Sequence, residues 1–578
     1  MIPKENPGTS PAVFSLRSKP SLPTESRQLP PHASQVIFSV TFMETNASST
    51  ANVDRISALP PPILHHILSF LSLEQVVPTS VLSKTWKQLW HTFPNVEYNP
   101  RRSTFRRQKM VLKYLEQFLL NRYLDAISLE KLTLRVELLS DDPDLESIMN
   151  RCLSYAFASN VKELKLDVGC CRIYNLPQIV FYLKSIYVLD FEFCKLEPPR
   201  STVTLFSLRK LCLSFVHVDD EVIRDMVAGC PLIEYININN CPGLKSLQLL
   251  GLNKLKEIKL DSNRCGLERV YINGVNVHSV DIKVYLEPCE VNVSSCKNLT
   301  HLRLDGLSIT DKWLYNQISE LPFLEYLALH YCMKLRSINI SSPRLKELVF
   351  ERCEELVEFE LDTPNLSIFK CFNYVESFSS NALALSQTLL CFISHPVDNE
   401  WYLKFIKLLA RFNLCSNVLN LQCNHEAVLI PRELREILCP PLTYHKHVSF
   451  SVLSEILEVS LANLVDCLLW ITPHAETLSI EWPNINFYEL SFQFSYKKKL
   501  TYEGETPSCC QSLPLSCWKH CIKEVKIECT EKYPIRQINR ESFSSEDGDI
   551  MEKINDLWKS LLDMMILHSK IFAEYDGP

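Results

Sequence analysis

The chain has 578 residues, of which 46% are hydrophobic and 22% are charged, a balance typical of a globular protein with a sizeable core. Its 60 Lys and Arg residues against 67 Asp and Glu residues give a net charge of −7, which argues against a nucleic-acid partner. Glycine is scarce, at 11 residues, which argues against glycine-rich phosphate-binding loops. The hydrophobic runs are shorter than the roughly 20 residues of a membrane helix, so we expect a soluble protein with no membrane partner.

The 23 cysteines are scattered through a long chain that lacks a convincing secretory signal. This distribution favours reduced thiols and a cytoplasmic or nuclear protein. The sequence has no Cys-x-x-Cys pair and no Cys/His set at zinc spacing, so we expect neither a metal nor a cofactor. We interpret the isolated pairs Cys517/Cys521 and His445/His447 as structural.

Residues 1–52 are rich in proline and serine and have little apolar periodicity, which predicts a disordered leader. Met43 stands just before the next segment, and translation that started there would lose nothing that looks folded.

Residues 59–90 are dense in apolar side chains at helical spacing. The three prolines 60–62 suit the start of a first helix, whose apolar face would include Ile63 and Ile67. A short second turn would end at Pro78. Thr79 or Ser80 would cap a third helix that reaches Trp90. So small a unit cannot bury all of this apolar surface, so some of it should contact a partner.

The sequence LPPPILHHILSFLSLEQVVPTSVLSKTWKQLW closely resembles the F-box in its plant form, although Pro61 replaces an acidic residue that is common after Leu-Pro. F-box proteins hold a Skp-type adaptor and so join a cullin ubiquitin ligase. The resemblance therefore implies an F-box over residues 53–97. The residues that would carry its fold and its adaptor surface, without a division between the two roles, are Leu59, Pro60, Ile63, Leu64, Ile67, Leu68, Val76, Val81, Leu82, Trp86, Leu89 and Trp90.

We interpret residues 98–128 as a linker followed by a helix that caps the next region. From residue 129 the pattern Leu-x-x-Leu-x-Leu-x-x-(Cys/Asn) recurs about every 22–25 residues, which is the spacing of leucine-rich repeats. Clear copies begin at Ile186, Ile233, Leu255, Leu324 and Leu345, and looser copies begin at Leu129, Val161, Leu208 and Leu299. Since no repeat buries its inner face alone, we predict a stacked solenoid over residues 129–500.

Within residues 233–277 and 324–366, apolar triplets recur about every 11 residues, too closely for a helix in each gap. Many repeats should therefore be strand-turn-strand, which gives a horseshoe with sheet on both sides. Short helices are expected near residues 219–230 and 310–318. The repeat cysteines Cys194, Cys241, Cys332 and Cys353 occupy the turn position and should be structural.

Past residue 380 the pattern weakens, and residues 401–410 look helical. Residues 514–530, with Cys517, Trp518 and the Lys-Glu-Val-Lys-Ile run, resemble the FBD module of plant F-box/leucine-rich-repeat proteins. An amphipathic helix is expected over residues 550–565 as a cap. Residues 501–578 are thus an FBD-like end, and the whole chain is expected to be α/β: a three-helix F-box, a leucine-rich-repeat solenoid and a capping region.

The sequence carries no P-loop, dinucleotide fingerprint, His-Glu-x-x-His or Gly-x-Ser-x-Gly motif, so we expect no enzyme. The preferred hypothesis is a substrate receptor of an SCF-type ubiquitin ligase that holds a protein target on its repeats. A leucine-rich-repeat scaffold that acts outside a ligase is the alternative, and a small-molecule sensor is a weaker one. The x residues of each strand face the partner, and the most interface-like of them are Tyr326, His330, Tyr331 and Arg352.

Overall fold

The computed structural model describes residues 56–99 apart from 58, 72–74, 77–78 and 80–82, then 105–138, 143–169, 173–285, 288–372, 377–382, 385–392, 397–413, 418–453, 461–485, 488–496, 522–531 and 570–571. The chain divides into two compact units, residues 1–58 and 59–578, and the helices and strands described lie in the second. Several predicted features lie outside the described residues: the leader 1–52, Val81, Leu82, Cys517, Trp518, Cys521 and the helix expected over 550–565.

Two helices of the F-box segment are described, α1 (Pro61–Leu68) and α3 (Lys84–Thr92). Helix α1 begins directly after Pro60, as the prolines predict. The cap predicted for the third helix was wrong. The Ser83 hydroxyl accepts the Trp86 amide at 3.2 Å, whereas the Thr79 hydroxyl donates to the Val76 carbonyl and so closes the preceding turn. Ser83 takes the position because its extended backbone aims its oxygen at the amide three residues on.

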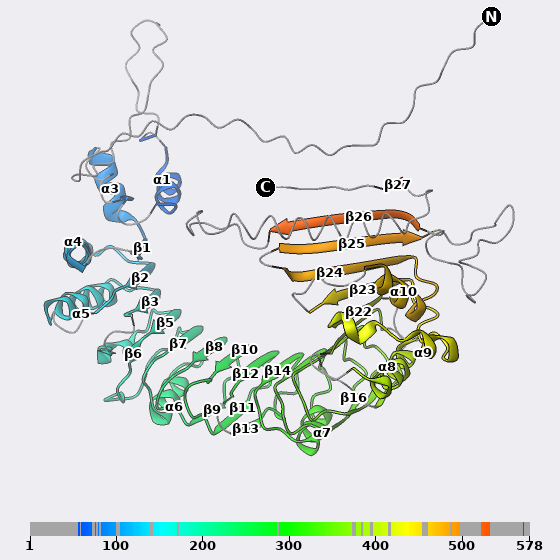
Figure 1. The fold of residues 1–578 in the computed structure, drawn as a ribbon. Helices are drawn as coiled ribbons and strands as arrows, with labels where there is room; N and C mark the ends of the chain where they lie inside the picture. The colour runs from blue at the N-terminus through cyan, green and yellow to red at the C-terminus, as the bar shows by residue number, and fades with distance from the viewer. Residues whose placement is uncertain are drawn as a thin grey trace, which may run out of the picture. The chain divides into compact units, whose positions relative to one another are not determined.

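The repeats are built on one long sheet whose strands each pair with the strand of the next repeat (Figure 1). Its parallel strands, in order of pairing, are β1 (Asn95–Tyr98), β2 (Lys131–Arg135), β3 (Glu163–Asp167), β5 (Val188–Glu192), β7 (Lys210–Ser214), β8 (Tyr235–Asn239), β10 (Glu257–Asp261), β12 (Ser279–Lys283), β14 (His301–Asp305), β15 (Tyr326–His330), β17 (Glu347–Glu351), β19 (Ile368–Phe372), β21 (Gln387–Phe392), β22 (Val418–Cys423), β23 (His447–Val452) and β24 (Thr477–Ile485).

Pairing is in phase with the sequence repeat. Ile236 of β8 lies opposite Ile258 of β10, which lies opposite Val280 of β12, and all three are buried. Because successive side chains of a strand point to opposite faces, the x residues between them face outward. The leucine-rich-repeat prediction is confirmed, and the fold is an α/β solenoid.

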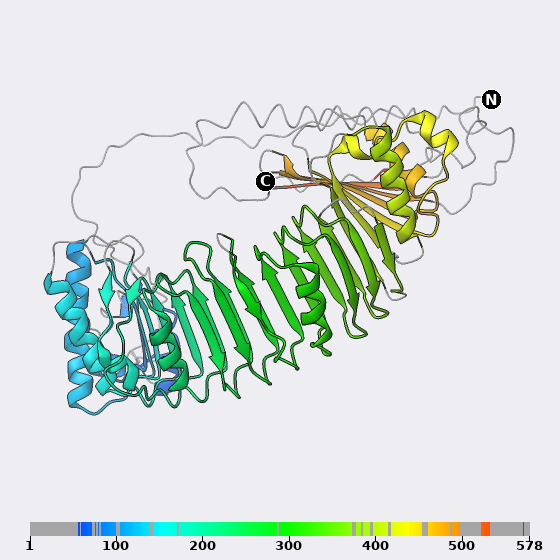
Figure 2. The same ribbon diagram turned by 90° about the horizontal axis from the view of Figure 1, so that it is seen from below.

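The convex side carries short sheets of its own, as the eleven-residue spacing predicts. They contain the strands β4 (Tyr174–Asn175) and β6 (Cys194–Lys195); β9 (Ser246–Leu250), β11 (Arg269–Asn273) and β13 (Glu290–Asn292); and β16 (Ser337–Ser341), β18 (Glu358–Asp362) and β20 (Ser377–Ser380). Figure 2 shows the strands side by side in successive repeats. The two expected convex helices are present as α6 (Asp220–Ala228) and α7 (Asp311–Ser319).

The strand ladder begins earlier than residue 129. Strand β1 pairs in register with β2, so the sheet starts within the segment that the sequence assigned to the F-box. The predicted capping helix is α4 (Phe105–Leu124), and it packs against a second helix, α5 (Pro143–Ala158), which the sequence did not predict. Together they cover the first repeats, with Leu112, Leu115 and Leu119 buried.

Toward the C-terminus the repeats become longer and carry helices on their outer side (Figure 1): α8 (Asn399–Phe412), α9 (Arg432–Ile437) and α10 (Leu461–Ile471). Two 3₁₀ helices, η1 (Gln178–Tyr182) and η2 (His425–Val428), fill other connections. Strand β25 (Tyr488–Tyr496) turns antiparallel to β24. It then pairs antiparallel with β26 (Ile522–Glu531), which contains the FBD-like run, and β27 (Lys570–Ile571) adds a last short pairing. Among the described residues, no helix is both long and apolar enough to cross a membrane.

Candidate functional site

Helix α1 has two apolar stripes with different surroundings. Leu64 and Leu68 are buried with Leu89 and Trp90 of α3, and they form the core of the helix pair. The His65 ring supports this packing, because its Nε2 lies 3.2 Å from both the Leu89 carbonyl and the Thr92 hydroxyl. One stripe is therefore committed to holding α1 on α3.

The second stripe is open to solvent. Ile63 and Ile67 are four residues apart in α1, which places them on one face of the helix, and Leu59 is exposed just before the helix begins. Ile63 is 47% exposed and Ile67 is 37% exposed, and Phe70, just past the end of the helix, is 75% exposed. Leu71 continues the same apolar surface. We call these five residues the α1 stripe.

The structure thus sorts the predicted F-box residues. Those placed in the core are Leu64, Leu68, Val76, Leu89 and Trp90; those exposed are Leu59, Pro60, Ile63 and Ile67; and Trp86 is partly buried against the core. Val81 and Leu82 lie outside the described residues. Phe70 was not among the predicted residues, although its place one turn beyond Ile67 is visible in the sequence.

A buried arginine joins the F-box helices to the first repeat. The Arg122 side chain, from the end of α4, is completely buried and donates to the carbonyls of His91 at 3.0 Å and Phe93 at 2.6 Å, and also to that of Ser128. Burial lowers the pKa of Arg122 to about 10. Its guanidinium lies 5.5 Å from the centre of the Phe118 ring, which in turn stacks on Trp90 at 4.4 Å. These contacts fix α3 relative to α4.

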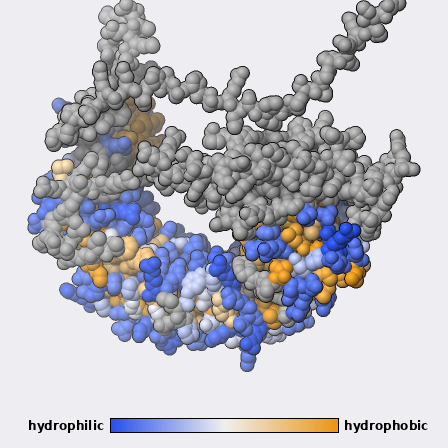
Figure 3. Space-filling view, in the orientation of Figure 1, coloured by the Kyte–Doolittle hydropathy of each residue, from blue (hydrophilic) through white to orange (hydrophobic). Residues whose placement is uncertain are grey.

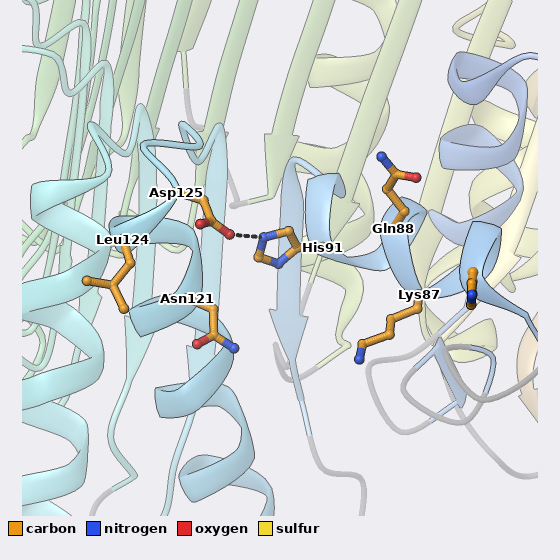
Figure 4. Close-up of a pocket in the computed structure, with 7 residues that line it drawn as sticks. Lys87, Gln88, His91, Asn121, Leu124 and Asp125 are labelled. Atoms are coloured by element: carbon orange, nitrogen blue, oxygen red, sulfur yellow. Dashed lines mark hydrogen bonds and ion pairs between the residues drawn. The ribbon is translucent and has the colours of Figure 1, made fainter.

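Between α3 and α4 the surface has an open hollow (Figure 4). It is lined by Lys84, Lys87, Gln88, His91, Asn121, Leu124 and Asp125. His91 Nε2 lies 2.7 Å from an Asp125 carboxylate oxygen across it. This hydrogen bond is a second, exposed link between the F-box helices and the repeats.

The structure does not gather the four predicted target-binding residues into one group. Tyr326 begins β15 and stacks on His301 of the neighbouring strand, with ring centres 5.7 Å apart. Tyr331 follows the other end of β15 and contacts two side chains, the Tyr285 ring at 5.4 Å and the Arg352 guanidinium at 5.4 Å. Tyr331 and Arg352 therefore form one partly exposed cluster, and Tyr326 lies apart from it.

His330 lies on the outward face of β15 but is buried, which the sequence did not predict. It is only 7% exposed and lies among charged neighbours: Nδ1 is 3.2 Å from Arg303 Nη2 and 3.5 Å from a Glu351 carboxylate oxygen. Burial and the Arg303 charge lower the pKa of His330. The alternation rule places His330 on the correct face of the strand, but the long side chains of β14 and β17 cover it.

The sequence also missed Tyr285 and His301, which complete the two aromatic contacts. Tyr285 donates through its hydroxyl to the buried Asp305 carboxylate at 2.5 Å, which holds the ring beside Tyr331. His301 occupies the first x position of β14, so the same strand pattern that pointed to Tyr326 would have found it.

The repeat cysteines are buried thiols, and Cys241 Sγ donates to the Leu213 carbonyl at 3.5 Å. Burial raises the pKa of Cys241 to about 12, so this thiol is protonated at neutral pH. Within the described part of the chain, no group of three or more His, Cys, Asp or Glu side chains is placed to hold a metal.

Comparison with known families agrees with this architecture. The F-box domain model matches residues 56–98, and the model described as the At1g61320/AtMIF1 LRR domain matches residues 122–288 and 282–431. The leucine-rich-repeat match covers more than half of the chain.

Similar curated proteins come from Arabidopsis thaliana. The F-box/LRR-repeat protein At3g18150 is 29% identical over 285 residues, which cover 48% of this chain and 58% of that protein. The F-box protein At5g03100 is 29% identical over 293 residues, 50% of this chain and 87% of that protein. The F-box/FBD/LRR-repeat protein At1g13570 is 24% identical over 336 residues, 55% of this chain and 75% of that protein.

The matches span a little over half the length of the first three relatives, 58%, 57% and 52%. The F-box match contains α1 and α3, and the leucine-rich-repeat match extends from the end of α4 into η2 and the residues just after it. The chain therefore belongs to the plant F-box/leucine-rich-repeat family, with repeats of the At1g61320/AtMIF1 type.

Proposed function

We propose that this chain is the substrate-recognition subunit of an SCF-type ubiquitin ligase. The F-box docks on a Skp-type adaptor, and through it on a cullin, while the repeats bind a protein target. The chain itself does no covalent chemistry. Its contribution is proximity, because it raises the effective concentration of a target lysine at the ubiquitin-conjugating enzyme. We place this complex in the cytoplasm or nucleus, where free thiols stay reduced.

The observation that carries the adaptor half of the proposal is the α1 stripe. Ile63 and Ile67 are exposed although Leu64 and Leu68, their sequence neighbours, are buried. Such an exposed apolar surface on a short helix is unfavourable in water and is typical of a surface that a partner covers. A helix presents it as a row of side chains that a complementary groove can receive.

The target half of the proposal rests on the outward face of the repeat sheet. The Tyr331–Arg352 cluster and the Tyr326–His301 pair place aromatic and arginine side chains, the types enriched in binding hot spots, on adjacent strands. Asp305, which pairs with Arg303, accepts the hydroxyl of Tyr285 and so holds that ring beside Tyr331, and such preorganisation lowers the entropy cost of binding.

The test uses the full chain co-expressed with a Skp-type adaptor, with the dissociation constant measured by titration calorimetry. Replacing both stripe isoleucines, Ile63→Asp with Ile67→Asp, should weaken adaptor binding by about a hundred-fold or more, because two central anchors are lost. A matched control is Ile173→Asp with Ile179→Asp, since those isoleucines are 51% and 48% exposed on the repeats. The control should bind as the wild type does.

Equal loss in both double variants, or no loss in either, would refute the assignment of the adaptor surface. Affinity purification from plant tissue then separates the two candidate functions. Retention of a cullin with the wild type, and its loss with the Ile63/Ile67 variant, supports the ligase. A chain that retains protein targets without adaptor or cullin would instead be a leucine-rich-repeat scaffold acting outside a ligase.

A further inference from the structure

A pair of phenylalanines stands at equivalent positions of two neighbouring repeats. Phe193 follows β5 and Phe215 follows β7, and their rings stack with centres 4.9 Å apart and planes 6° from parallel. Both are partly exposed. Each amide extends the sheet by one bond, Phe193 to the Ser214 carbonyl at 3.0 Å and Phe215 to the Asn239 carbonyl at 2.8 Å. The backbone at this position therefore takes part in the hydrogen bonding of the sheet, and this does not depend on the side chain.

Other repeats share the left-handed backbone at this position, since Asn240, Tyr331 and Arg352 adopt it with φ 46°, 53° and 52°. Asn240 follows β8 with the same left-handed backbone, φ 46° against 55° and 52° for the two phenylalanines. Its buried side chain bonds the side chains of Asn239 and Asp261. Asparagine tolerates this conformation because its short side chain bonds locally, whereas phenylalanine does not. The two rings are thus not explained by the needs of the turn.

The strand end that directly precedes Phe193 has an excess of negative charge. The register of the sheet places Asp167 of β3 directly opposite Glu192 of β5, so the two carboxylates are neighbours on one face. Arg135 pairs with Asp167 at 2.8 Å and Lys165 pairs with Asp190 at 2.9 Å. Within the described residues, the Glu192 carboxylate has no cation in ion-pair contact. Burial and the Asp167 charge raise the pKa of Glu192, against the opposing effect of the Arg135 and Lys165 charges.

We propose that Phe193, Phe215 and Glu192 bind an arginine side chain in a basic segment of the target protein. The planar guanidinium stacks on the Phe193 ring while its N–H groups donate to the carboxylate of Glu192, the preceding residue. Arginine fits better than lysine because it makes both contacts at once with a flat, weakly hydrated cation. This inference rests on the proposed role of the repeats in target binding, and it names the chemistry that one part of the target presents.

The test is a selection from a random-peptide phage library on the immobilised full chain. The wild type should enrich arginine-containing peptides. A selected peptide is then synthesised with its arginine or with glutamine in that place, and affinity is measured by fluorescence anisotropy. The change to glutamine should weaken binding by about ten-fold.

The informative variant is Phe193→Asn with Phe215→Asn, which installs the residue that the next repeat already uses at Asn240. It should fold as the wild type does and bind the arginine peptide about ten-fold more weakly. Glu192→Arg should reverse the selection toward acidic peptides. Matched controls are Phe206→Ala, an exposed phenylalanine away from the pair, and Glu163→Gln, at the opposite end of β3; both should leave the affinity unchanged.

The proposal is overturned if the wild type enriches peptides without arginine or enriches none. It is equally overturned if the double asparagine variant binds the arginine peptide as tightly as the wild type does. Adaptor binding by the same preparations is measured in parallel. Retained adaptor binding with failed arginine selection rejects this site alone, whereas lost adaptor binding with intact selection rejects the ligase role alone.

Discussion

Helix α1 of the F-box and the strands of the repeats expose their apolar side chains to different degrees. In a repeat strand such as β10, the apolar residues Ile258 and Leu260 are buried and the residues between them are polar. In α1, Leu64 and Leu68 are buried, but Ile63 and Ile67 beside them remain exposed. Figure 3 shows the corresponding surface, with hydrophilic residues over much of the coloured part of the repeats and hydrophobic patches among them.

This difference indicates how each region reaches stability. A repeat buries its inner face against its neighbours, so the solenoid is complete once its repeats are stacked. The two F-box helices described are too short to bury both stripes of α1, and the second stripe stays exposed. In the proposed function, the repeats supply the surface for recognition, and the exposed stripe of α1 supplies the surface for assembly.

The largest effect is expected where the two regions join, at Arg122. Arg122→Met removes the donor to three carbonyls in a buried setting and should lower the free energy of unfolding by about 4 kcal/mol. Thermal denaturation and limited proteolysis between α3 and α4 measure the loss. Arg151→Met is the matched control, because Arg151 makes an exposed ion pair with Glu116 and its removal should cost about 1 kcal/mol or less. Equal stability of the two variants would contradict a structural role for Arg122.

A second prediction contrasts the two stripes of α1. Leu68→Ala leaves a cavity in the core and should destabilise the protein by about 3 kcal/mol. Ile67→Ala, the neighbouring residue, should change stability by about 0.5 kcal/mol and mainly weaken adaptor binding. Chemical denaturation and adaptor titration of the two variants test this separation. A stability loss at Ile67 equal to that at Leu68 would show that both stripes belong to the core.

On the repeats, the triple variant Tyr326→Ala, Tyr331→Ala and Arg352→Ala should weaken target binding by about 2 kcal/mol, because two aromatic anchors and one cation are lost. His330 is left unchanged because it is buried, so its replacement would not distinguish a lost contact with the target from a change in the repeat structure. Co-purification with a target found by proteomics, in the presence of a proteasome inhibitor, is the measurement. Wild-type recovery of the target would move the recognition surface elsewhere on the repeats.

The smallest effect concerns pH and the C-terminal repeats. His445 is fully buried, neither ring nitrogen has a hydrogen-bond partner among the described residues, and burial lowers its pKa from 6.5 to about 4. As the pH falls, His445 therefore binds a proton in the unfolded chain at a higher pH than in the folded chain. The stability that the neutral His445 contributes is fully present above pH 6.5 and is lost as the pH falls toward 4. The free energy of unfolding should fall by roughly 1 kcal/mol between about pH 7.5 and 6. The free energy of unfolding of His445→Phe, measured by denaturant titration, should depend less on pH over that range. The same pH dependence as in the wild type would contradict the assignment.

Sequence periodicity predicted the repeat sheet because alternation along a strand decides which side chains face inward. It also predicted the convex strands, since an eleven-residue spacing leaves no room for a helix. Strand β1 was missed because four residues with two apolar positions, Val96 and Tyr98, carry too weak a pattern. The Ser83 cap was missed because Thr79, Ser80 and Ser83 are all chemically suitable, and only the folded backbone selects one.

The candidate site was less predictable than the fold. Both stripes of α1 are apolar at helical spacing, and only the position of α3 decides that Leu64 is covered and Ile63 is not. The outward direction of His330 was predicted correctly from strand alternation, but its burial by Arg303 and Glu351 depends on neighbouring repeats. Likewise, stacking of Phe193 on Phe215 depends on the register between β5 and β7, which a single repeat does not reveal.

The measurement that addresses the exposed stripe most directly is hydrogen–deuterium exchange of the full chain, with and without a saturating Skp-type adaptor. We predict slower exchange of the backbone amides of α1 and the residues that follow it when the adaptor is bound, with the repeat strands β10 to β17 unchanged. Exchange in α1 that is the same with and without bound adaptor, or protection confined to the repeats, would contradict the account.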